Sequence, residues 1–196
     1  DTQIARFDSV LGNLQRAGIE TGWVHIANSA ATLRRADAHR DLVRVGIAMY
    51  GIAPDASMDA MCSNLRQALS LKSRVSFIKK VSAGEGISYG QRYRVQEATR
   101  IATVPLGYAD GVPRRLSDVG GEVLIAGQRF PIVGRVTMDQ LMVDIGNSSI
   151  AVGDEVVLLG SQGQETITPN DWGQVLDTIG YEIVCGLSAR LARVYC

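Results

Sequence analysis

Three short polar clusters hold the side chains of this chain that could take part in proton chemistry. They are residues 86–90 (Gly-Ile-Ser-Tyr-Gly), 107–111 (Gly-Tyr-Ala-Asp-Gly) and 138–140 (Met-Asp-Gln). Glycine lets the backbone approach closely and adopt positive φ, so such clusters build shaped loops. A tyrosine that acts as a base needs cations around it, because its phenol normally titrates near pH ~10. From the residues alone, Tyr89 could be no more than a packed tyrosine in a turn, as most tyrosines are.

A second set of residues could hold an anion. Asn28 and Ser29 follow an apolar run and open a predicted helix, so Ser29 can offer its hydroxyl and nearby free N–H groups. Gly46 and Ile47 lie on the next apolar run, where a missing side chain allows a backbone N–H to reach a phosphate oxygen. The alternative is that Asn28 and Ser29 only cap the helix.

Arg44 stands within an apolar segment, Leu-Val-Arg-Val-Gly-Ile. A charged group there is costly to bury unless something pairs with it. The alternative is an arginine at a strand end that reaches solvent. His25 is one of two histidines, and a lone histidine in a buried strand is more often a satisfied core group than a ligand. The second histidine, His39, lies in a polar stretch typical of a solvated surface.

The first fifty residues alternate helical and strand-like patterns. Residues 2–17 predict an amphipathic helix that Gly18 ends, and residues 29–38 predict a second helix. The apolar run at 23–27 predicts a short buried strand. The apolar run at 42–49 predicts a second strand. Strands separated by helices imply parallel pairing, as in a Rossmann-like sheet or the end of a (β/α)₈ barrel.

The pattern changes after Pro54, where a linker-like stretch leads into short β-type runs. Such strands with regular turn signals predict a closed or sandwich-like β-domain. Residues 126–128 predict a hairpin connection, and Thr168, Pro169 and Asp171 predict the start of one helix. The candidate strands are residues 71–81, 99–105, 123–125, 130–133, 142–145 and 155–159.

Composition excludes several classes of function. The chain of 196 residues carries 20 basic and 20 acidic residues. It therefore has no excess of positive charge with which to bind a nucleic acid or a membrane surface. The apolar runs are too short to span a bilayer, and no secretory signal is visible. The three cysteines fit neither a disulfide framework nor a zinc site, so we expect no metal and a reducing, cytoplasmic setting.

The clusters, taken in this order after residues 25–30 (His-Ile-Ala-Asn-Ser-Ala) and 44–51 (Arg-Val-Gly-Ile-Ala-Met-Tyr-Gly), closely resemble the C-terminal half of bacterial alanine racemases. The resemblance covers essentially the whole chain. It favours α/β plus β architecture: the last strands and helices of a (β/α)₈ barrel at residues 1–55, followed by a mostly β C-terminal domain at 56–196. It implies a pyridoxal 5′-phosphate (PLP) enzyme that interconverts L- and D-alanine for peptidoglycan synthesis.

The resemblance also implies roles for single residues. Tyr89 matches the tyrosine that removes the proton from L-alanine, while a PLP-bearing lysine acts on the opposite face. Tyr108 matches a tyrosine at the substrate entrance, and Met138 matches the residue whose backbone meets the substrate carboxylate. Arg44 matches an arginine that faces the pyridine nitrogen of PLP, with His25 orienting it. The residues that match the rest of the cofactor site are Asn28, Ser29, Gly46 and Ile47.

In this family the β-domain of one subunit completes the site on the barrel of the other, so a homodimer with composite sites is implied. The segment with the PLP-bearing lysine is absent, because all three lysines (Lys72, Lys79 and Lys80) fall in the β-domain. The chain is therefore expected to be inactive alone. Ala189 replaces a phosphate-contacting tyrosine of some relatives, which leaves a racemase of serine or another amino acid as an alternative. A non-catalytic binding or dimerisation module is the other alternative.

Overall fold

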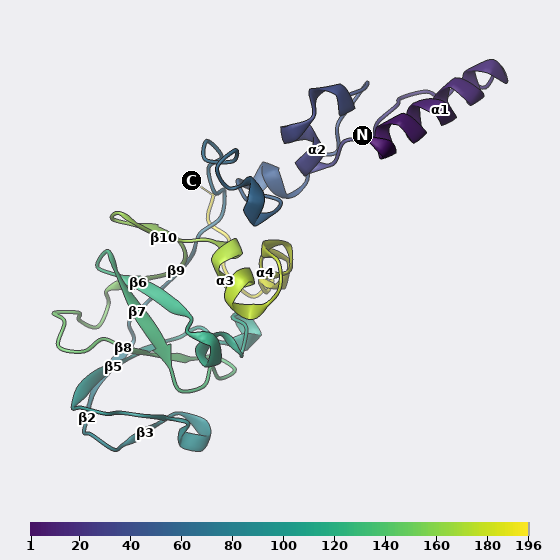
Figure 1. The fold of residues 1–196 in the computed structure, drawn as a ribbon. Coiled ribbons are helices and arrows are strands. Elements are labelled where there is room, and N and C mark those ends of the chain that lie inside the picture. The colour runs from purple at the N-terminus through teal and green to yellow at the C-terminus, as the bar shows by residue number, and fades with distance from the viewer. Residues whose placement is uncertain (196) are drawn as a thin grey trace. The chain divides into compact units, whose positions relative to one another are not determined.

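The computed structural model describes residues 1–195 and divides the chain into two compact units, Asp1–Ala68 and Leu69–Cys196. Figure 1 labels the α-helices and most of the strands of the two units. Among residues 1–195, no helix combines the length and the apolar character that a membrane crossing requires.

The regular elements described in the first unit are all helices. This unit contains α1 (Thr2–Arg16), α2 (Ser29–Arg34) and the 3₁₀ helices η1 (Ala36–Ala38), η2 (Ile47–Tyr50) and η3 (Ala56–Met58). Helix α1 confirms the predicted helix, and the Gly18 N–H donates to the Gln15 carbonyl just beyond its end. A small core forms around Met58 and Cys62.

Regular strands predicted at residues 23–27 and 42–49 are not present among the described residues. The two segments instead run parallel through an isolated bridge between Asn28 and Arg44, supported by the Arg44 N–H bond to the Ala27 carbonyl at 2.9 Å. The prediction of a buried strand was also wrong for Trp23, which is 76% exposed, whereas Ala27 is fully buried. Parallel sheets generally have both faces covered, and among residues 1–195 the isolated bridge joins these two segments to each other.

The predicted helix at 29–38 is interrupted. Arg35 leaves helical geometry with φ −136° and ψ 85°, so that α2 stops and a separate 3₁₀ turn follows. The Arg35 guanidinium binds both Asp1 and Asp37, which fixes this break.

The second unit is built on one antiparallel sheet with the order β1-β9-β6-β7-β8-β5-β2, to which β10 adds beside β9. The strands are β1 (Leu71–Arg74), β2 (Phe77–Val81), β5 (Thr99–Val104), β6 (Glu122–Ile125), β7 (Gln128–Val133), β8 (Leu141–Asp144), β9 (Glu155–Gln162) and β10 (Glu165–Ile167). A separate hairpin joins β3 (Gly86–Ile87) to β4 (Tyr93–Arg94).

The first and last strands of the sheet, β1 and β2, follow each other along the chain. The predicted strand at 71–81 is split because Val75 bonds to Asp154 while Ser76 bonds to Thr103, so the chain changes partner from β9 to β5 at this point. The two ends of the sheet are therefore brought together, as in a closed β structure. This arrangement confirms the predicted mostly β C-terminal domain.

The helices of the second unit pack onto the core of the sheet. Helix α3 (Pro169–Leu176) starts with the predicted signals, because Thr168 and Asp171 form a reciprocal capping box ahead of Pro169. Its Trp172 and the Ile183 side chain of α4 (Gly180–Gly186) belong to the same buried cluster as the sheet residues. Helix α4 had no sequence prediction.

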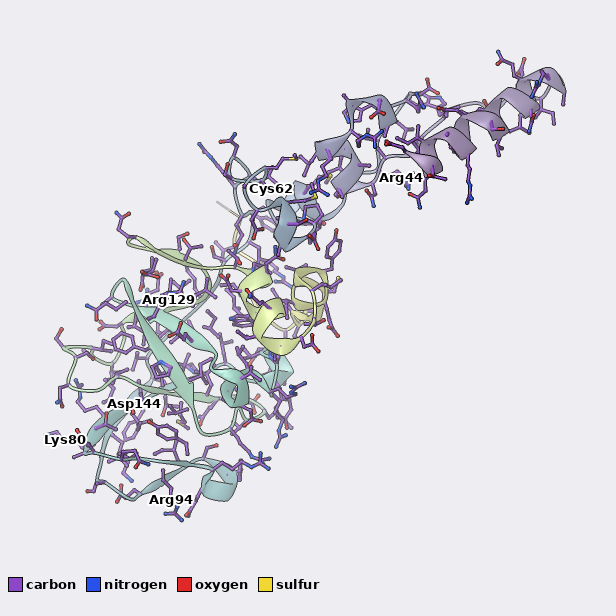
Figure 2. All side chains as sticks on the ribbon, viewed as in Figure 1. Arg44, Cys62, Lys80, Arg94, Arg129 and Asp144 are labelled. Carbon is purple, nitrogen blue, oxygen red and sulfur yellow. The ribbon has the colours of Figure 1, made fainter. Side chains whose placement is uncertain are left out.

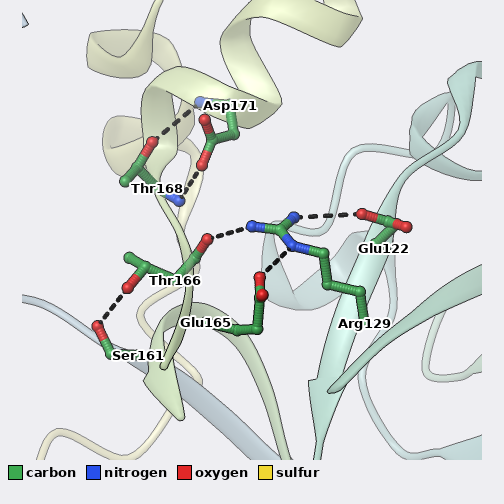
Figure 3. Close-up of polar contacts among 7 residues, drawn as sticks. All are labelled: Glu122, Arg129, Ser161, Glu165, Thr166, Thr168 and Asp171. Carbon is green, nitrogen blue, oxygen red and sulfur yellow. Dashed lines mark hydrogen bonds and ion pairs between the residues drawn. The ribbon is translucent and has the colours of Figure 1, made fainter. Parts of the chain in front are cut away.

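An arginine-centred network joins three strands next to α3 (Figure 3). Arg129 on β7 donates to Glu165 at 2.6 Å, to Glu122 at 3.2 Å and to the Thr166 carbonyl at 2.5 Å. The turn before Arg129 is the predicted hairpin, in which Ala126 and Gly127 both have positive φ and Ile125 pairs with Gln128. The network holds β6, β7 and β10 in register beneath the helix.

Candidate active site

The first unit brings together the residues predicted to bind the cofactor. The Gly46 N–H donates to Ser29 Oγ at 2.8 Å, and Ser29 is only 5% exposed. Asn28 caps α2 by accepting from the Ala31 N–H at 3.0 Å. Ile47 begins η2, so its N–H has no partner within that helix. Capping and anion binding are therefore compatible here, because Asn28 caps while the Ser29 hydroxyl proton remains available.

Arg44 is exposed but not isolated. Its Nη1 lies 2.8 Å from His25 Nδ1, so the imidazole fixes one edge of the guanidinium and leaves the remaining N–H groups to other acceptors. A neutral histidine with Nδ1 as acceptor fits this contact. The contact between His25 and Arg44 is therefore present, while their role in binding the cofactor stays a prediction; Figure 2 marks Arg44 on its segment.

The second unit brings Tyr89, Tyr108 and Met138 to one pocket. Arg114, Arg135 and residues 136–140 complete its lining. All three predicted side chains are exposed, Tyr89 to 75%, and so are open to a molecule in the pocket. The Arg135 Nε is buried and has no hydrogen-bond partner within the described chain. The pocket lining therefore combines two phenols and two arginines with the carboxylate of Asp139, which is paired with Arg190, so the lining suits a small anionic ligand.

Backbone contacts fix the two loops on one side of this pocket. The Tyr108 N–H donates to the Thr137 carbonyl at 2.9 Å, and the Ala109 N–H donates to the Met138 carbonyl at 3.0 Å. Gly107 is packed so closely that an added Cβ would collide with the carbonyl oxygens of Thr137 and Met138. The positions of Tyr108 and Met138 are therefore set by main-chain atoms.

A buried carboxylate supports the same loops from behind. Asp110, 5% exposed, accepts from the Gly107 N–H at 2.8 Å and from Arg190 Nε at 2.6 Å. Arg190 also donates to Asp139 at 2.5 Å, next to Met138. The hydrogen bond from Arg190, helped by the Gly107 N–H, holds the pKa of Asp110 below its usual range although burial opposes this.

Sequence reasoning gave Asp110 and Arg190 no role. Asp110 lies inside one of the glycine clusters, and a carboxylate between glycines in a predicted loop was a usable signal. Arg190 lies 80 positions further along the chain, and no local pattern connects it to Asp110. Among the described residues, no three His, Cys, Asp or Glu side chains gather in a way that could hold a metal ion.

Comparison with known proteins agrees with this arrangement. The family model of the alanine racemase C-terminal domain matches residues 68–195, and that of the N-terminal domain matches residues 1–54. Alanine racemases from Carboxydothermus hydrogenoformans and Symbiobacterium thermophilum are 50% and 47% identical over 98% of this chain, which covers 52% and 51% of their lengths. The chain thus spans about half the length of these relatives.

Solved structures give the same result. The chain superposes on alanine racemase from Streptomyces lavendulae with a TM-score of 0.92 and 41% identity, covering 99% of this chain and 51% of that one. The alanine racemase from Bacillus anthracis, solved with bound L-Ala-P, gives 0.90 and 44%, covering 96% and 48%. The fold is thus that of a racemase β-domain preceded by a helical segment. The chain belongs to the alanine racemase family and comprises the end of the N-terminal domain and the C-terminal domain.

Proposed function

We propose that the protein containing this chain is a PLP-dependent alanine racemase that supplies D-alanine for peptidoglycan synthesis in the cytoplasm. The observation that carries the proposal is the single pocket lined by Tyr89, Tyr108 and Met138, which come from three separate loops. Residues 1–55 would form the end of the barrel and residues 56–196 the β-domain. Because the chain spans about half the length of its relatives, the proposal concerns the full-length protein.

The donor set of the first unit fits the phosphate of PLP. Ser29, which accepts from the Gly46 N–H, still has its hydroxyl proton to give, the Ile47 N–H lies at the start of a helical turn, and a Cβ at Gly46 would meet only Ser29 Oγ, at 3.8 Å. Arg44, oriented by His25, would donate to the pyridine nitrogen. When bound, PLP withdraws electrons from Cα of the amino acid and so makes its proton acidic.

The second unit supplies the groups that act on the amino acid. Tyr89 would take the Cα proton of L-alanine on one face, and a lysine of the remaining part of the protein would give a proton to the opposite face; in the reverse direction Tyr89 would give the proton back. The backbone of Met138 would receive the substrate carboxylate, and Tyr108 would line the entrance. In this proposal Tyr89 and Met138 act on the PLP of a partner subunit, so the functional unit is a homodimer.

Serine is a second candidate substrate. Ala189 lies directly before Arg190, is exposed, and presents only a methyl group where some relatives have a tyrosine. A smaller side chain beside Arg190 would leave more room for a hydroxymethyl group. The experiment below therefore compares both amino acids.

The test is the Tyr89→Phe variant of the full-length protein with PLP. Phenylalanine keeps the ring but removes the ionisable group, so the fold should persist. Solvent deuterium incorporation at Cα in single turnovers should fall by ~10²–10⁴-fold with L-alanine and much less with D-alanine. L-Serine, measured in the same way, shows which substrate is preferred.

The matched control is Tyr181→Phe on α4, where the tyrosine is 37% exposed and does not line the pocket. It should exchange at the parent rate. Small and equal losses for both enantiomers in Tyr89→Phe would mean that Tyr89 is a packed loop residue, and the proposal would fall.

A further inference from the structure

Tyr89 lies in a hairpin that cannot hold its own shape. Strands β3 and β4 have two residues each, and a short isolated hairpin is marginally stable in water. The turn between them contains Ser88 at φ 62° and ψ −173°, a backbone conformation that residues other than glycine rarely adopt. Such a backbone persists only where surrounding contacts enforce it. Attachments outside the hairpin must therefore determine where Tyr89 lies.

One attachment holds the residue before Tyr89. Ser88 Oγ donates to the Arg135 carbonyl at 2.9 Å, which fastens the start of the turn to the wall of the pocket. The Gln91 N–H donates to the Ser88 carbonyl at 3.2 Å and closes the turn itself. Neither contact fixes the second strand of the hairpin.

A carboxylate holds the second strand. Tyr93, opposite Ile87 on β4, donates its hydroxyl to Asp144 Oδ2 at 2.9 Å. The other oxygen of Asp144 accepts from Thr99 Oγ1 at 2.6 Å and from the Gly146 N–H at 3.1 Å. Asp144 ends β8 and Thr99 begins β5, so the hairpin is tied to the main sheet where two strands meet; Figure 2 marks Asp144 and the hairpin residue Arg94.

Tyr93 is suited to act as a permanent donor. Its ring is partly buried against a small core that includes Val81, Ile87 and Val133. Burial, together with the hydrogen bond to Asp144 and its charge, raises the pKa of Tyr93 to about 12. Tyr89, four residues earlier, is 75% exposed. The hairpin thus presents one tyrosine to the pocket and anchors itself with the other.

We propose that Tyr93, Asp144 and Thr99 form an anchor that sets the position of Tyr89, so that Tyr93 is a positioning residue for proton transfer at Cα. The proposal rests on the proposed role of Tyr89. If the anchor is released, the hairpin can shift on the sheet while the rest of the pocket, fixed by the loops at Tyr108 and Met138, stays in place. The defect should therefore appear in the proton-transfer step and not in substrate binding.

The experiment uses the full-length protein with PLP and the variants Tyr93→Phe, Thr99→Val and Thr99→Ser. Tyr93→Phe removes only the hydroxyl, and Thr99→Val removes a donor that Thr99→Ser retains. A misplacement of about 1 Å can cost ~10²-fold in rate. Tyr93→Phe and Thr99→Val should lower deuterium exchange from L-alanine by roughly 10- to 100-fold, with a smaller loss from D-alanine and little change in KM. Thr99→Ser should recover most of the rate.

Two further measurements separate positioning from stability alone. In a Tyr89→Phe background, adding Tyr93→Phe should cause no further loss of exchange, because the anchor acts only through Tyr89. In protein labelled with ¹³C at tyrosine Cζ, the signal that Tyr89→Phe removes should shift or broaden in Tyr93→Phe. This second readout does not depend on activity.

The anchor proposal would be overturned if Tyr93→Phe lowered deuterium exchange from L- and D-alanine equally. It would also be overturned if Tyr93→Phe lowered exchange as much in the Tyr89→Phe background as in the parent. Either result would leave Tyr93 as a structural residue. Unchanged exchange in Tyr93→Phe and Thr99→Val would do the same. If Tyr93→Phe fails to fold, the Thr99→Val and Thr99→Ser pair decides the question. If Tyr89→Phe itself shows no preference for L-alanine, the proposed function has failed, and that result is separate from any defect in the anchor variants.

Discussion

Gly107 gives the sharpest prediction about the pocket, because its position follows from backbone packing alone. A methyl group there would collide with the Thr137 and Met138 carbonyl oxygens and lie 2.5 Å from the Met138 carbonyl carbon. Main-chain atoms in a paired loop cannot rotate away as a side chain can. Gly107→Ala should therefore force the two loops apart and break the hydrogen bonds from the Tyr108 and Ala109 N–H groups.

The expected cost has two parts. Overpacking typically costs 1–3 kcal/mol, and each of the two backbone hydrogen bonds contributes ~0.5–1.5 kcal/mol, so the loss is about 2–6 kcal/mol. The melting temperature of the domain should fall by roughly 5–20 °C. In the full-length protein, kcat/KM for alanine should fall as well, because Tyr108 and Met138 separate.

The matched control is Gly186→Ala at the end of α4. An added Cβ there meets no atom within 4 Å, so the free energy of unfolding of this variant should lie within ~1 kcal/mol of the parent's. Calorimetry and steady-state kinetics on both variants test the argument. If Gly107→Ala has the same melting temperature as Gly186→Ala and retains the parent kcat/KM, the close packing of the two loops is not what positions the pocket.

Two other residues give predictions of a different kind. The lowered pKa of Asp110 means that its contribution to stability is present above the unfolded-state pKa, near ~4, and is lost as the pH falls through the folded-state value. Asp110→Asn should therefore lower the free energy of unfolding at pH 7 by ~1–3 kcal/mol and make that free energy depend less on pH below ~4. Urea denaturation at several pH values measures both effects. An unchanged dependence on acid pH would contradict this prediction. Arg44→Glu should slow racemisation by the PLP-loaded, full-length protein by roughly 10²-fold, because glutamate cannot replace the guanidinium donor held by His25, and an unchanged rate would leave Arg44 as a surface charge only.

Local sequence patterns predicted most elements of the β-domain. The turn at Ala126 and Gly127 and the capping box at Thr168 are short-range features, and the structure contains both. The split between β1 and β2 was not predictable, because the change of partner at Val75 and Ser76 depends on distant strands. Strands β3 and β4 escaped notice since two residues are too few to show a period.

The candidate site divides in the same way. Ser29, Gly46 and Arg44 lie close in sequence, and their contacts follow from adjacent segments. The ion pair between Asp110 and Arg190 depends on how the chain end returns to the loops, which no local spacing encodes. The difference between Tyr89 and Tyr93 was likewise invisible in the sequence, because burial and a carboxylate partner distinguish them.

The way the pocket is built separates its shape from its chemistry. Main-chain hydrogen bonds and the close approach at Gly107 fix the loops, and Arg190 fastens them through Asp110 and Asp139. None of these contacts uses the side chains of Tyr108 or Met138. Ala189 also takes no part in the contacts of Arg190 with Asp110 and Asp139, although it directly precedes Arg190. Substitutions at such positions can therefore alter which amino acid is accepted, while changes at Gly107 or Asp110 should disturb every substrate alike.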